Sequence, residues 1–593
     1  MGKGLGHCAS RSWIAFWTQA AMWLSSLKRQ HVGTEPSSAK KRVLERRTTP
    51  LMPSPPRRIP GSAFQAGTFL NQFAKFIVHA AVLALGRPVV TAPLLGSSGR
   101  VHAHAKKPKK VKIVSVCSGS EGLLTGLHEL NACYKEEQID LELGLVCSCE
   151  KDDWKRGWCK RVHEVIDEDM EHPSDACIFH NVETLAAEGA DVCDAHKVQS
   201  DDKCKLPDWF DGLVAGFSCK DLSRANFRSI IKSCGGAPLD LMATRSSPGQ
   251  TLNTLHAILK ILARHRPDWA ILENVDFDEK SQNQSLWDQL QVTLAELGYD
   301  TKKYVLNASQ FVLPQSRTRA YLILVRQPAR QAHVKSYDEF FASVTALVEK
   351  FSEPPPDLGT VLFPNDHEAV QHAYANCAAK SRNDGAWKQE SLSIHKEEWS
   401  KLKGGDAMYL RPQFEEEVKR SKWFALLTER AKNSLWKHEC EMKQTYQKNP
   451  SHLAVARAGA DIGQSISRLR HTTTIPFGHV VVAPTLLPHT LLWLGSVSGR
   501  AFYRPLIGVE ALQLQGWPIM NTKFDSLRKD FENNKLMDLA GNAFPVTVVT
   551  ALINALMFSF TRHMELEQNI PTASSQNDVD SAKEMLKAVG CSL

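Results

Sequence analysis

Long apolar runs are missing from this 593-residue chain: no stretch reaches about 18 uninterrupted apolar residues, so no membrane span is predicted. The 14 cysteines include no Cys-x-x-Cys pair, which suits a reducing compartment rather than a secreted disulfide framework. No internal repeat is visible. We also predict no metal site, because the side chains that first suggest one match no common ligand spacing and are interpreted as structural: Cys147, Cys149, Cys159 and His163. The hydrophobic share of 43% is ordinary for a globular protein.

Acidic residues are scarce at the amino end. Residues 1–110 hold 18 Lys or Arg against 2 Asp or Glu, a net of +16, so the rest of the chain sums to −8 within a total of +8. This leader, taken as residues 1–108, lacks sustained apolar periodicity. We therefore expect it to be disordered, to be dispensable for folding, and to bind DNA or another nucleic acid in a salt-sensitive way.

The basic clusters at 40–47 and 106–110 are typical of a nuclear-import signal or a phosphate-binding patch. An acid-poor amino terminus that carries Arg and Ser also fits a transit peptide for a plastid or mitochondrion. A solvated linker without any address is the third interpretation, and composition alone leaves all three open.

The first predicted strand, at 112–116, runs into a loop of small residues before a helix at 123–130. Gly119 and Gly122 let backbone amides approach a ligand at the start of this helix, although many such turns need glycine for geometry only. The next strand, at 141–148, ends beside Glu150. A carboxylate in this place can accept two ribose hydroxyls, as it does in doubly wound nucleotide-binding folds.

Two further buried strands are predicted at 213–217 and 269–275. The first ends next to Cys219, and the second delivers Glu273 to the same sheet edge, so that a thiol and a carboxyl form a pair of nucleophile and acid. A structural cysteine and an isolated strand-end glutamate are the alternative. Strand and helix alternate from Lys112 to Val275, which predicts a mostly parallel α/β sheet covered on both faces.

Three polar residues, Gln315, Arg317 and Arg319, alternate just before a strand at 320–325. Alternation places their side chains on one face of the strand. Such a face is either a solvated basic strand end or a cluster that reads an anion or a base.

Taken in order, these motifs resemble the cytosine-C5 DNA methyltransferases, which use S-adenosylmethionine. The resemblance rests on the segments 118–122, Glu150, 216–219, Glu273-Asn274-Val275, Gln315-x-Arg317-x-Arg319, 504–518 and 541–544, within about 300 of the 593 residues. It implies the Rossmann-like fold of class I methyltransferases, with a mostly parallel doubly wound sheet and a smaller inserted target-recognition domain.

The resemblance also implies a role for each matching position. The residues implied in catalysis are Cys219, Glu273, Arg317 and Arg319. Those implied in binding the cofactor are Cys117, Ser118, Gly119, Ser120, Gly122, Glu150, Asn181, Val182, Asn542 and Ala543. Ser218, Asn274 and Gln315 are implied in binding the substrate. The implied partner is DNA, with no membrane.

Five parts follow from the family order. They are the leader (1–108), the first part of the catalytic domain (109–326), a target-recognition region (327–480), its support with the closing part of the catalytic domain (481–567), and a mobile tail (568–593). An apolar helix at 546–556 is expected to pack beside the first strand. The tryptophans of the target-recognition region are interpreted as core residues rather than stacking platforms.

Two positions depart from the family pattern. Ser218 stands where the family has proline before its nucleophile, which removes a restraint on that loop. Asn181 stands where an acid contacts adenine, although an amide can still bond that edge. A tRNA cytosine-5 methyltransferase and a catalytically inactive DNA-binding relative are therefore kept as alternatives.

Overall fold

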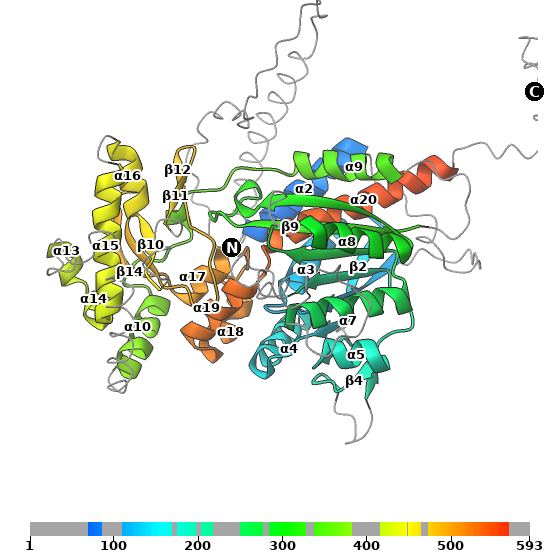
Figure 1. Ribbon diagram of the computed structural model, residues 1–593, viewed down its shortest axis with the longest axis horizontal. Coiled ribbons are helices and arrows are strands. Elements are labelled where there is room, and N and C mark those ends of the chain that lie inside the picture. Colours follow the sequence, from blue (N-terminus) through cyan, green and yellow to red (C-terminus); the bar gives the residue numbers. More distant parts are fainter. Residues whose placement is uncertain are drawn as a thin grey trace, which may run out of the picture. The chain divides into compact units, whose positions relative to one another are not determined.

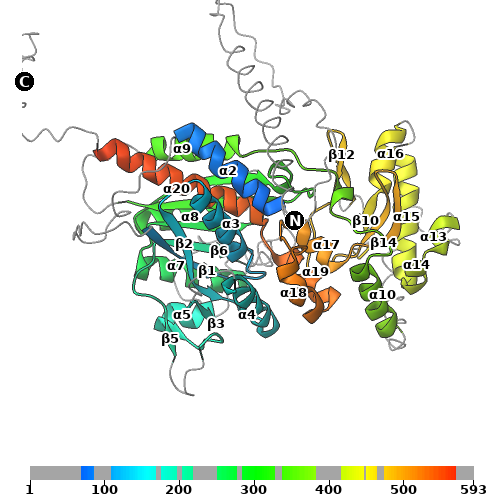
Figure 2. The ribbon, with the colours of Figure 1, turned by 180° about the vertical axis from the view of Figure 1, so that it is seen from behind.

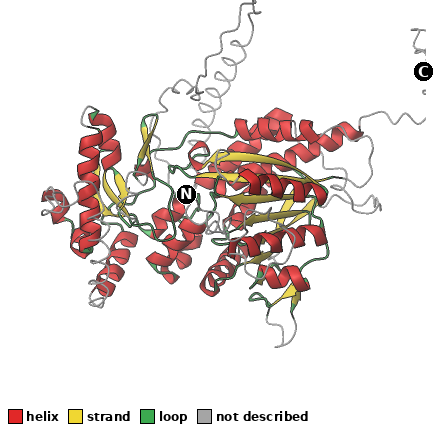
Figure 3. Ribbon diagram, in the orientation of Figure 1, coloured by secondary structure: helices red, strands yellow, loops and turns green. Residues whose placement is uncertain are grey.

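Seven strands form the central sheet, in the order β3-β2-β1-β6-β7-β9-β8 (Figure 3). The first five strands in this order are parallel to one another, and β9 is antiparallel to both β7 and β8. Their bounds are β1 Lys109–Val116, β2 Leu141–Cys149, β3 Cys177–Phe179, β6 Gly212–Gly216, β7 Trp269–Asn274, β8 Tyr299–Asn307 and β9 Thr318–Arg326. The predicted fold class, a mostly parallel doubly wound α/β sheet, is confirmed.

The computed structural model describes ten segments of the chain, all within one unit that spans 60–593. These segments are 69–85, 109–168, 175–196, 203–217, 250–276, 284–327, 337–381, 416–446, 449–463 and 473–568. Several sequence predictions lie outside them, namely those on the basic clusters, on Ser218 and Cys219, and on the tail beyond 568.

Helices cover both faces of the sheet (Figure 1). On one face lie α2 Phe69–Leu85, α3 Gly122–Glu136, α4 Asp153–Asp167, α9 Tyr337–Lys350 and α20 Val546–Gln568. On the other lie α5 Val182–Glu188, α7 Gln250–His265 and α8 Gln284–Glu296. Because both faces are covered, the central strands are apolar throughout, and all six residues of β7 are buried.

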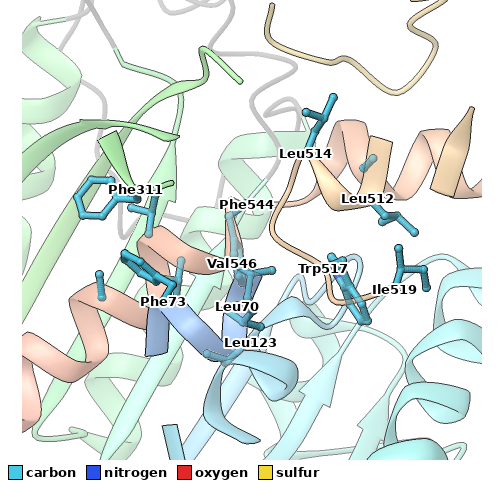
Figure 4. Packing of buried hydrophobic residues seen from close by; sticks show 14 of the residues in the cluster. Leu70, Phe73, Leu123, Phe311, Leu512, Leu514, Trp517, Ile519, Phe544 and Val546 are labelled. Atoms are coloured by element: carbon cyan, nitrogen blue, oxygen red, sulfur yellow. The ribbon is translucent and has the colours of Figure 1, made fainter. Parts of the chain in front are cut away.

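The leader contains a core helix at Phe69–Leu85, so the expectation that residues 1–108 are disordered is wrong for this segment. Helix α2 buries six apolar side chains at helical spacing: Leu70, Phe73, Ala74, Ile77, Val78 and Ala81. It packs against α3, α9 and α20. Figure 2 shows α2 beside α3 and α20, and Figure 4 shows Leu70 of its first turn beside Leu123 and Val546. The Asn554 side chain of α20 also donates to the carbonyl of Ile77 (3.1 Å).

The closing helix α20 returns to the loop that follows β1. A Cβ built on Gly122 would lie 2.6 Å from a methyl group of Val546, so glycine is needed for this approach. By length and composition alone, the stretch 533–561 could cross a membrane, but its most apolar 18-residue window is entirely buried inside the protein, as a core helix is.

A second group of elements follows β9 along the chain. It contains an antiparallel sheet of β10 Gly459–Asp461, β13 Leu492–Val497 and β14 Arg500–Pro505, and a hairpin of β11 Ile475–Phe477 and β12 Val480–Val482. Its helices are α10 Glu368–Ser381, α13 Glu416–Arg420, α14 Lys422–Leu426, α15 Glu429–Thr445 and α16 Pro450–Arg457. Trp423 is buried and packs edge-on against Tyr374, as expected of a core residue.

The connection back to the sheet is built around a buried ion pair. Both guanidinium NH groups of Arg504 donate to the Glu510 carboxylate (2.6 and 2.8 Å), and both side chains are fully buried. The backbone amide of Phe363 donates to the same carboxylate (2.7 Å). Since every charge here has partners, the pair can fix these segments in place. The elements that complete this part are α17 Gly508–Gln513, α18 Asp525–Asp530 and α19 Asn533–Asn542.

Candidate active site

The loop after β1 lies at the point where the strand order reverses, between β1 and β6. Cys117, Gly119 and Glu121 adopt positive φ angles of 57°, 56° and 59°, which fold the loop tightly. Ser120 anchors it, since its carbonyl accepts from the indole of Trp158 (2.7 Å) and its hydroxyl accepts from Trp517 (3.2 Å). The turn thus begins α3 in the geometry that nucleotide-binding folds use to approach a ligand.

Glu150 stands at the end of β2, as predicted. Its carboxylate accepts from the backbone amide of Gly119 (2.9 Å) and from that of Asp152 (3.1 Å). The acid therefore joins the loop after β1 to the end of β2. This is where a carboxylate meets the ribose of a bound nucleotide in doubly wound folds.

The remaining predicted cofactor residues lie at helix ends. Asn181 caps α5, its side-chain oxygen accepting from the amide of Glu183, and Val182 is the first residue of that helix. Asn542 ends α19 and is exposed, whereas Ala543 after it is buried. The side-chain oxygen of Asn181 is thus already engaged within the protein.

Glu121 is the unexpected member of this loop. Its side chain is fully buried, and neither carboxylate oxygen makes a well-formed hydrogen bond among the described residues. Burial raises the pKa of Glu121 to about 7; the nearby side chains of Ser148, Cys159 and Ser118 oppose that rise, and the charge of Glu150 adds to it. A buried acid at this position can stabilise a cationic ligand group.

Stability is expected to depend on pH through Glu121. Its pKa is raised in the folded state, so its favourable contribution is complete below about pH 4.5 and is lost as the pH rises through about 7. The loss amounts to at most about 3 kcal/mol. Glu121→Gln cannot ionise. The free energy of unfolding of the wild type, measured by urea titration between pH 5 and 8, should therefore fall relative to that of the variant. A constant difference between the two proteins would contradict this assignment.

The carboxyl ends of β6 and β7 form the second half of the site. Glu273 is the strand partner of Gly216. Its Oε2 atom lies 3.4 Å from the position that a Cβ on Gly216 would take. Arg319, from the neighbouring strand β9, contacts Glu273 through Nε (3.1 Å to Oε1). Burial raises the pKa of Glu273, and the charges of Arg319 and Arg317 oppose that rise. A buried acid with a raised pKa beside a strand end is suited to donate a proton.

Asn274 acts on the backbone rather than at the substrate position predicted for it. Its side-chain amide donates to the carbonyl of Phe217 (3.0 Å), and its side-chain oxygen accepts from the amide of Val275 (2.8 Å). Phe217 is the last described residue before Ser218 and Cys219. The amide of Asn274 therefore fixes the end of β6 from which the segment carrying the predicted nucleophile departs.

Arg317, expected to hold the base or a phosphate, is engaged inside the protein. Its guanidinium donates to three backbone carbonyls, those of Leu486 (2.9 Å), Gly541 (3.1 Å) and Ala543 (2.6 Å). The side chain is 3% exposed. Arg317 is therefore a positioning residue that joins the strand β9 to the closing segment.

Gln315, predicted to contact the substrate, likewise forms a buried link within the protein. Its side-chain oxygen accepts from the amide of Gln515 (2.8 Å), and both side chains are fully buried. The alternation of Gln315, Arg317 and Arg319 does place all three on one buried face, as expected. That face turns toward the protein, and Arg319 forms an ion pair with Glu273.

Sequence reasoning missed Arg156 of α4. This buried side chain donates to the carbonyls of Glu150 (3.3 Å) and Lys151 (2.7 Å) and to the carboxylate of Asp194 (2.8 Å). No motif marks it, because its partners are backbone groups, a distant acid and the local acid Asp153 (2.9 Å).

Comparison with known proteins places this geometry in a family. The family model described as C-5 cytosine-specific DNA methylase matches residues 181–557, more than half of the chain. Among curated relatives, the DNA (cytosine-5-)-methyltransferase DMT5 of Cryptococcus neoformans is 24% identical over 474 residues, which cover 76% of this chain and 17% of that protein. The type II methyltransferase M.NgoBV of Neisseria gonorrhoeae is 35% identical over 136 residues, 22% of this chain and 27% of that protein.

Among solved structures, the Dnmt2 methyltransferase of S. pombe is similar, with 14% identity and a TM-score of 0.34 over 75% of this chain and 98% of that one. The chain spans between 13% and 39% of the length of the curated relatives it matches. The family match covers the β6 and β7 strand ends and the closing segment that Arg317 holds. The chain belongs to the C-5 cytosine-specific DNA methylase family.

Proposed function

We propose that the protein transfers a methyl group from S-adenosylmethionine to C5 of cytosine in DNA. The observation that carries the proposal is the position of Glu273, a buried acid paired with Arg319 and facing the end of β6. The chain continues from that strand end to Cys219, three residues beyond Gly216. Family membership makes this pair of acid and thiol the expected catalytic machinery.

Cytosine C5 is a poor nucleophile, so the reaction begins with an attack on the neighbouring carbon. The Cys219 thiolate adds to C6, and the displaced electron pair moves through C5 toward the N3 and N4 edge, where Glu273 supplies a proton. After C5 has taken the methyl group, a base removes the C5 proton. The returning electron pair restores the double bond and expels the thiolate. Arg319 holds the Glu273 carboxyl in place for this exchange.

The residues around the loop after β1 fit S-adenosylmethionine. The positive φ angles at Cys117 and Gly119 fold the loop so that its backbone amides gather at the start of α3. The Glu150 carboxylate lies beside them and accepts from the amide of Gly119. The buried acid of Glu121 suits a cationic ligand. When bound, the cofactor supplies an electrophilic methyl group. Ser118, Ser120, Gly122 and Val182 complete the set proposed to hold it, with Asn181, Asn542 and Ala543 at its edge.

A cytosine inside a stacked duplex cannot reach this site. We therefore propose that the target base flips out of the helix, at a cost of a few kcal/mol. The region 327–480 is proposed to read the DNA, supported by 481–567, and the basic leader to add salt-sensitive affinity. A DNA substrate accords with a nuclear location; the alternative is a plastid or mitochondrion.

DNA that contains 5-fluorocytosine tests the proposal directly, because fluorine at C5 cannot leave as a proton and the adduct should persist. We expect a covalent complex that resists denaturation, forms with DNA but not with tRNA, and requires S-adenosylmethionine. The control variant Cys219→Ser should form none, since an alkoxide is scarcely available near neutral pH. A complex with tRNA alone would favour the tRNA-modifying alternative. Protein that binds donor and DNA without any adduct would favour the inactive relative, which the departures at Ser218 and Asn181 keep open.

A further inference from the structure

Three cysteines and a histidine converge at the edge of the sheet beyond β3, apart from the site described above. Cys177 begins β3, Cys193 and His196 follow β4 Ala190–Asp191, and Cys204 begins β5 Cys204–Lys205. One ligand atom from each of the four lies within 4.8 Å of the other three. All four side chains are half-buried, and the three cysteines are free.

The distances around His196 fit one common centre. Its Nδ1 atom lies 3.4, 3.5 and 3.6 Å from the sulfurs of Cys177, Cys193 and Cys204. A zinc ion bound tetrahedrally, with Zn–S near 2.3 Å and Zn–N near 2.0 Å, places its nitrogen and sulfur ligands about 3.5 Å apart. The three distances from His196 Nδ1 to the cysteine sulfurs agree with that value.

Hydrogen bonds from the three thiols to His196 do not account for the short distances around its ring. The Nε2 atom of His196 contacts the Asp175 carboxylate (2.7 Å), and a proton donated there leaves Nδ1 with a single lone pair. One lone pair cannot accept from three thiols at once. A cation between the four atoms satisfies all of them, and the Asp175 carboxylate then orients the ring as such partners do at zinc sites.

We propose that Cys177, Cys193, His196 and Cys204 bind a structural zinc ion. Four protein ligands leave no open position, which distinguishes a structural site from a catalytic one. The expectation that the chain has no metal site rested on Cys147, Cys149, Cys159 and His163, whose spacing matches no common ligand pattern. It overlooked the pair Cys193-x-x-His196. The two remaining ligands of the proposed site, Cys177 and Cys204, lie on separate strands.

The proposed ion would restrain the segment after β2 that carries Glu150. Between two of its ligands stands Asp194, whose carboxylate accepts from Arg156 (2.8 Å) and contacts His180 (2.6 Å). Arg156 in turn donates to the carbonyls of Glu150 and Lys151. The cluster also closes the segment from β3 to β5, and the amide of Ile178 contacts the Cys193 sulfur (3.3 Å). The bound zinc ion would therefore link β5 to the end of β2.

Metal analysis of the full chain tests the site without reference to methyl transfer. Protein purified without chelator, or supplied with Zn²⁺ and then desalted, should hold about one zinc per chain. Cys193→Ser should lower that content at least about tenfold. Cys440→Ser removes an equally half-buried thiol from α15 and should leave it unchanged. Cobalt(II) in place of zinc should give the absorption of a tetrahedral thiolate site.

A milder variant guards against misfolding. Asp175 is almost fully exposed, so Asp175→Asn should leave the fold intact while lowering zinc affinity by about 10–100-fold in competition with a chelator. Protein that takes up no zinc even when it is supplied would overturn the proposal. So would a disulfide between two of the three cysteines, found by mass spectrometry of protein kept under reducing conditions.

Discussion

Glu273→Gln is expected to lower the rate of methyl transfer by about 10²–10⁴-fold, the usual scale for loss of a general acid. The amide can still bond the N3 and N4 edge of cytosine, but it has no proton to transfer as the thiolate adds to C6. Binding of S-adenosylmethionine should be unaffected, since the proposed donor site is built by the loop after β1 and by Glu150. Single-turnover transfer of a radiolabelled methyl group to DNA measures the effect.

The pH dependence of the reaction gives a second readout for Glu273. Burial raises the pKa of its carboxyl, so that the protonated form persists nearer to neutral pH than in an exposed glutamate. If this proton is used, the single-turnover rate should fall as the pH rises through the raised pKa. In Glu273→Gln that limb of the profile should disappear.

The same strand offers a matched control. Asp268, at the opposite end of β7, is also buried and pairs with an arginine of β9, Arg326 (2.5 Å). Asp268→Asn therefore removes an equivalent buried charge without touching the proposed site. We expect it to change stability and leave the single-turnover rate within about twofold. If both variants lost activity alike, the effect of Glu273 would be structural, and its role as an acid would be withdrawn.

The sheet was predictable because its signals are local. Buried strands alternate with amphipathic helices, and a parallel sheet covered on both faces is the arrangement that buries both. The positions of Glu150 and Glu273 at strand ends follow from the same pattern, since parallel strands bring their carboxyl ends to one edge. These features needed no knowledge of which distant residues meet.

The partners of buried polar groups were not predictable in this way. Alternation placed Arg317 and Gln315 on one face, but it could not reveal that the carbonyls of Gly541 and Ala543 lie opposite that face. The metal ligands are similar, because Cys177 and Cys204 meet only once β3 and β5 have been brought together. Glu121 was read as loop, and only the structure shows that its buried carboxyl makes no well-formed hydrogen bond among the described residues.

Helix α2 was missed for a different reason. Its apolar residues recur at helical spacing from Leu70 through Phe73 and Ile77 to Ala81. The leader was considered as a whole, and over its full length it lacks sustained apolar periodicity, so this one helix was overlooked. Its main partner, α20, lies more than 450 residues further along the chain, so no local pattern joins the two.

Removal of residues 1–86 is accordingly expected to abolish cooperative folding, contrary to what the leader's composition suggests. Each of the four larger buried side chains of α2 contributes about 1.5–3 kcal/mol on burial. Their total, about 6–12 kcal/mol, is comparable with the whole stability of a typical domain. The loss also uncovers apolar surface on α3 and α20, which should cause aggregation. A chain that begins at Gly67 keeps α2 and is the matched control; thermal unfolding followed by circular dichroism compares the two.

Point variants of α2 separate packing from the mere presence of the segment. Phe73 is 3% exposed and contacts Phe311 edge-on, with ring centroids 6.5 Å apart, so Phe73→Ala should cost about 3–5 kcal/mol. Leu83, on the same helix, is 64% exposed, and Leu83→Ala should change stability by no more than about 0.5 kcal/mol. Equal effects of the two variants in urea unfolding would show that α2 is not docked on the core. A large difference between them would instead make the leader an integral part of the catalytic domain.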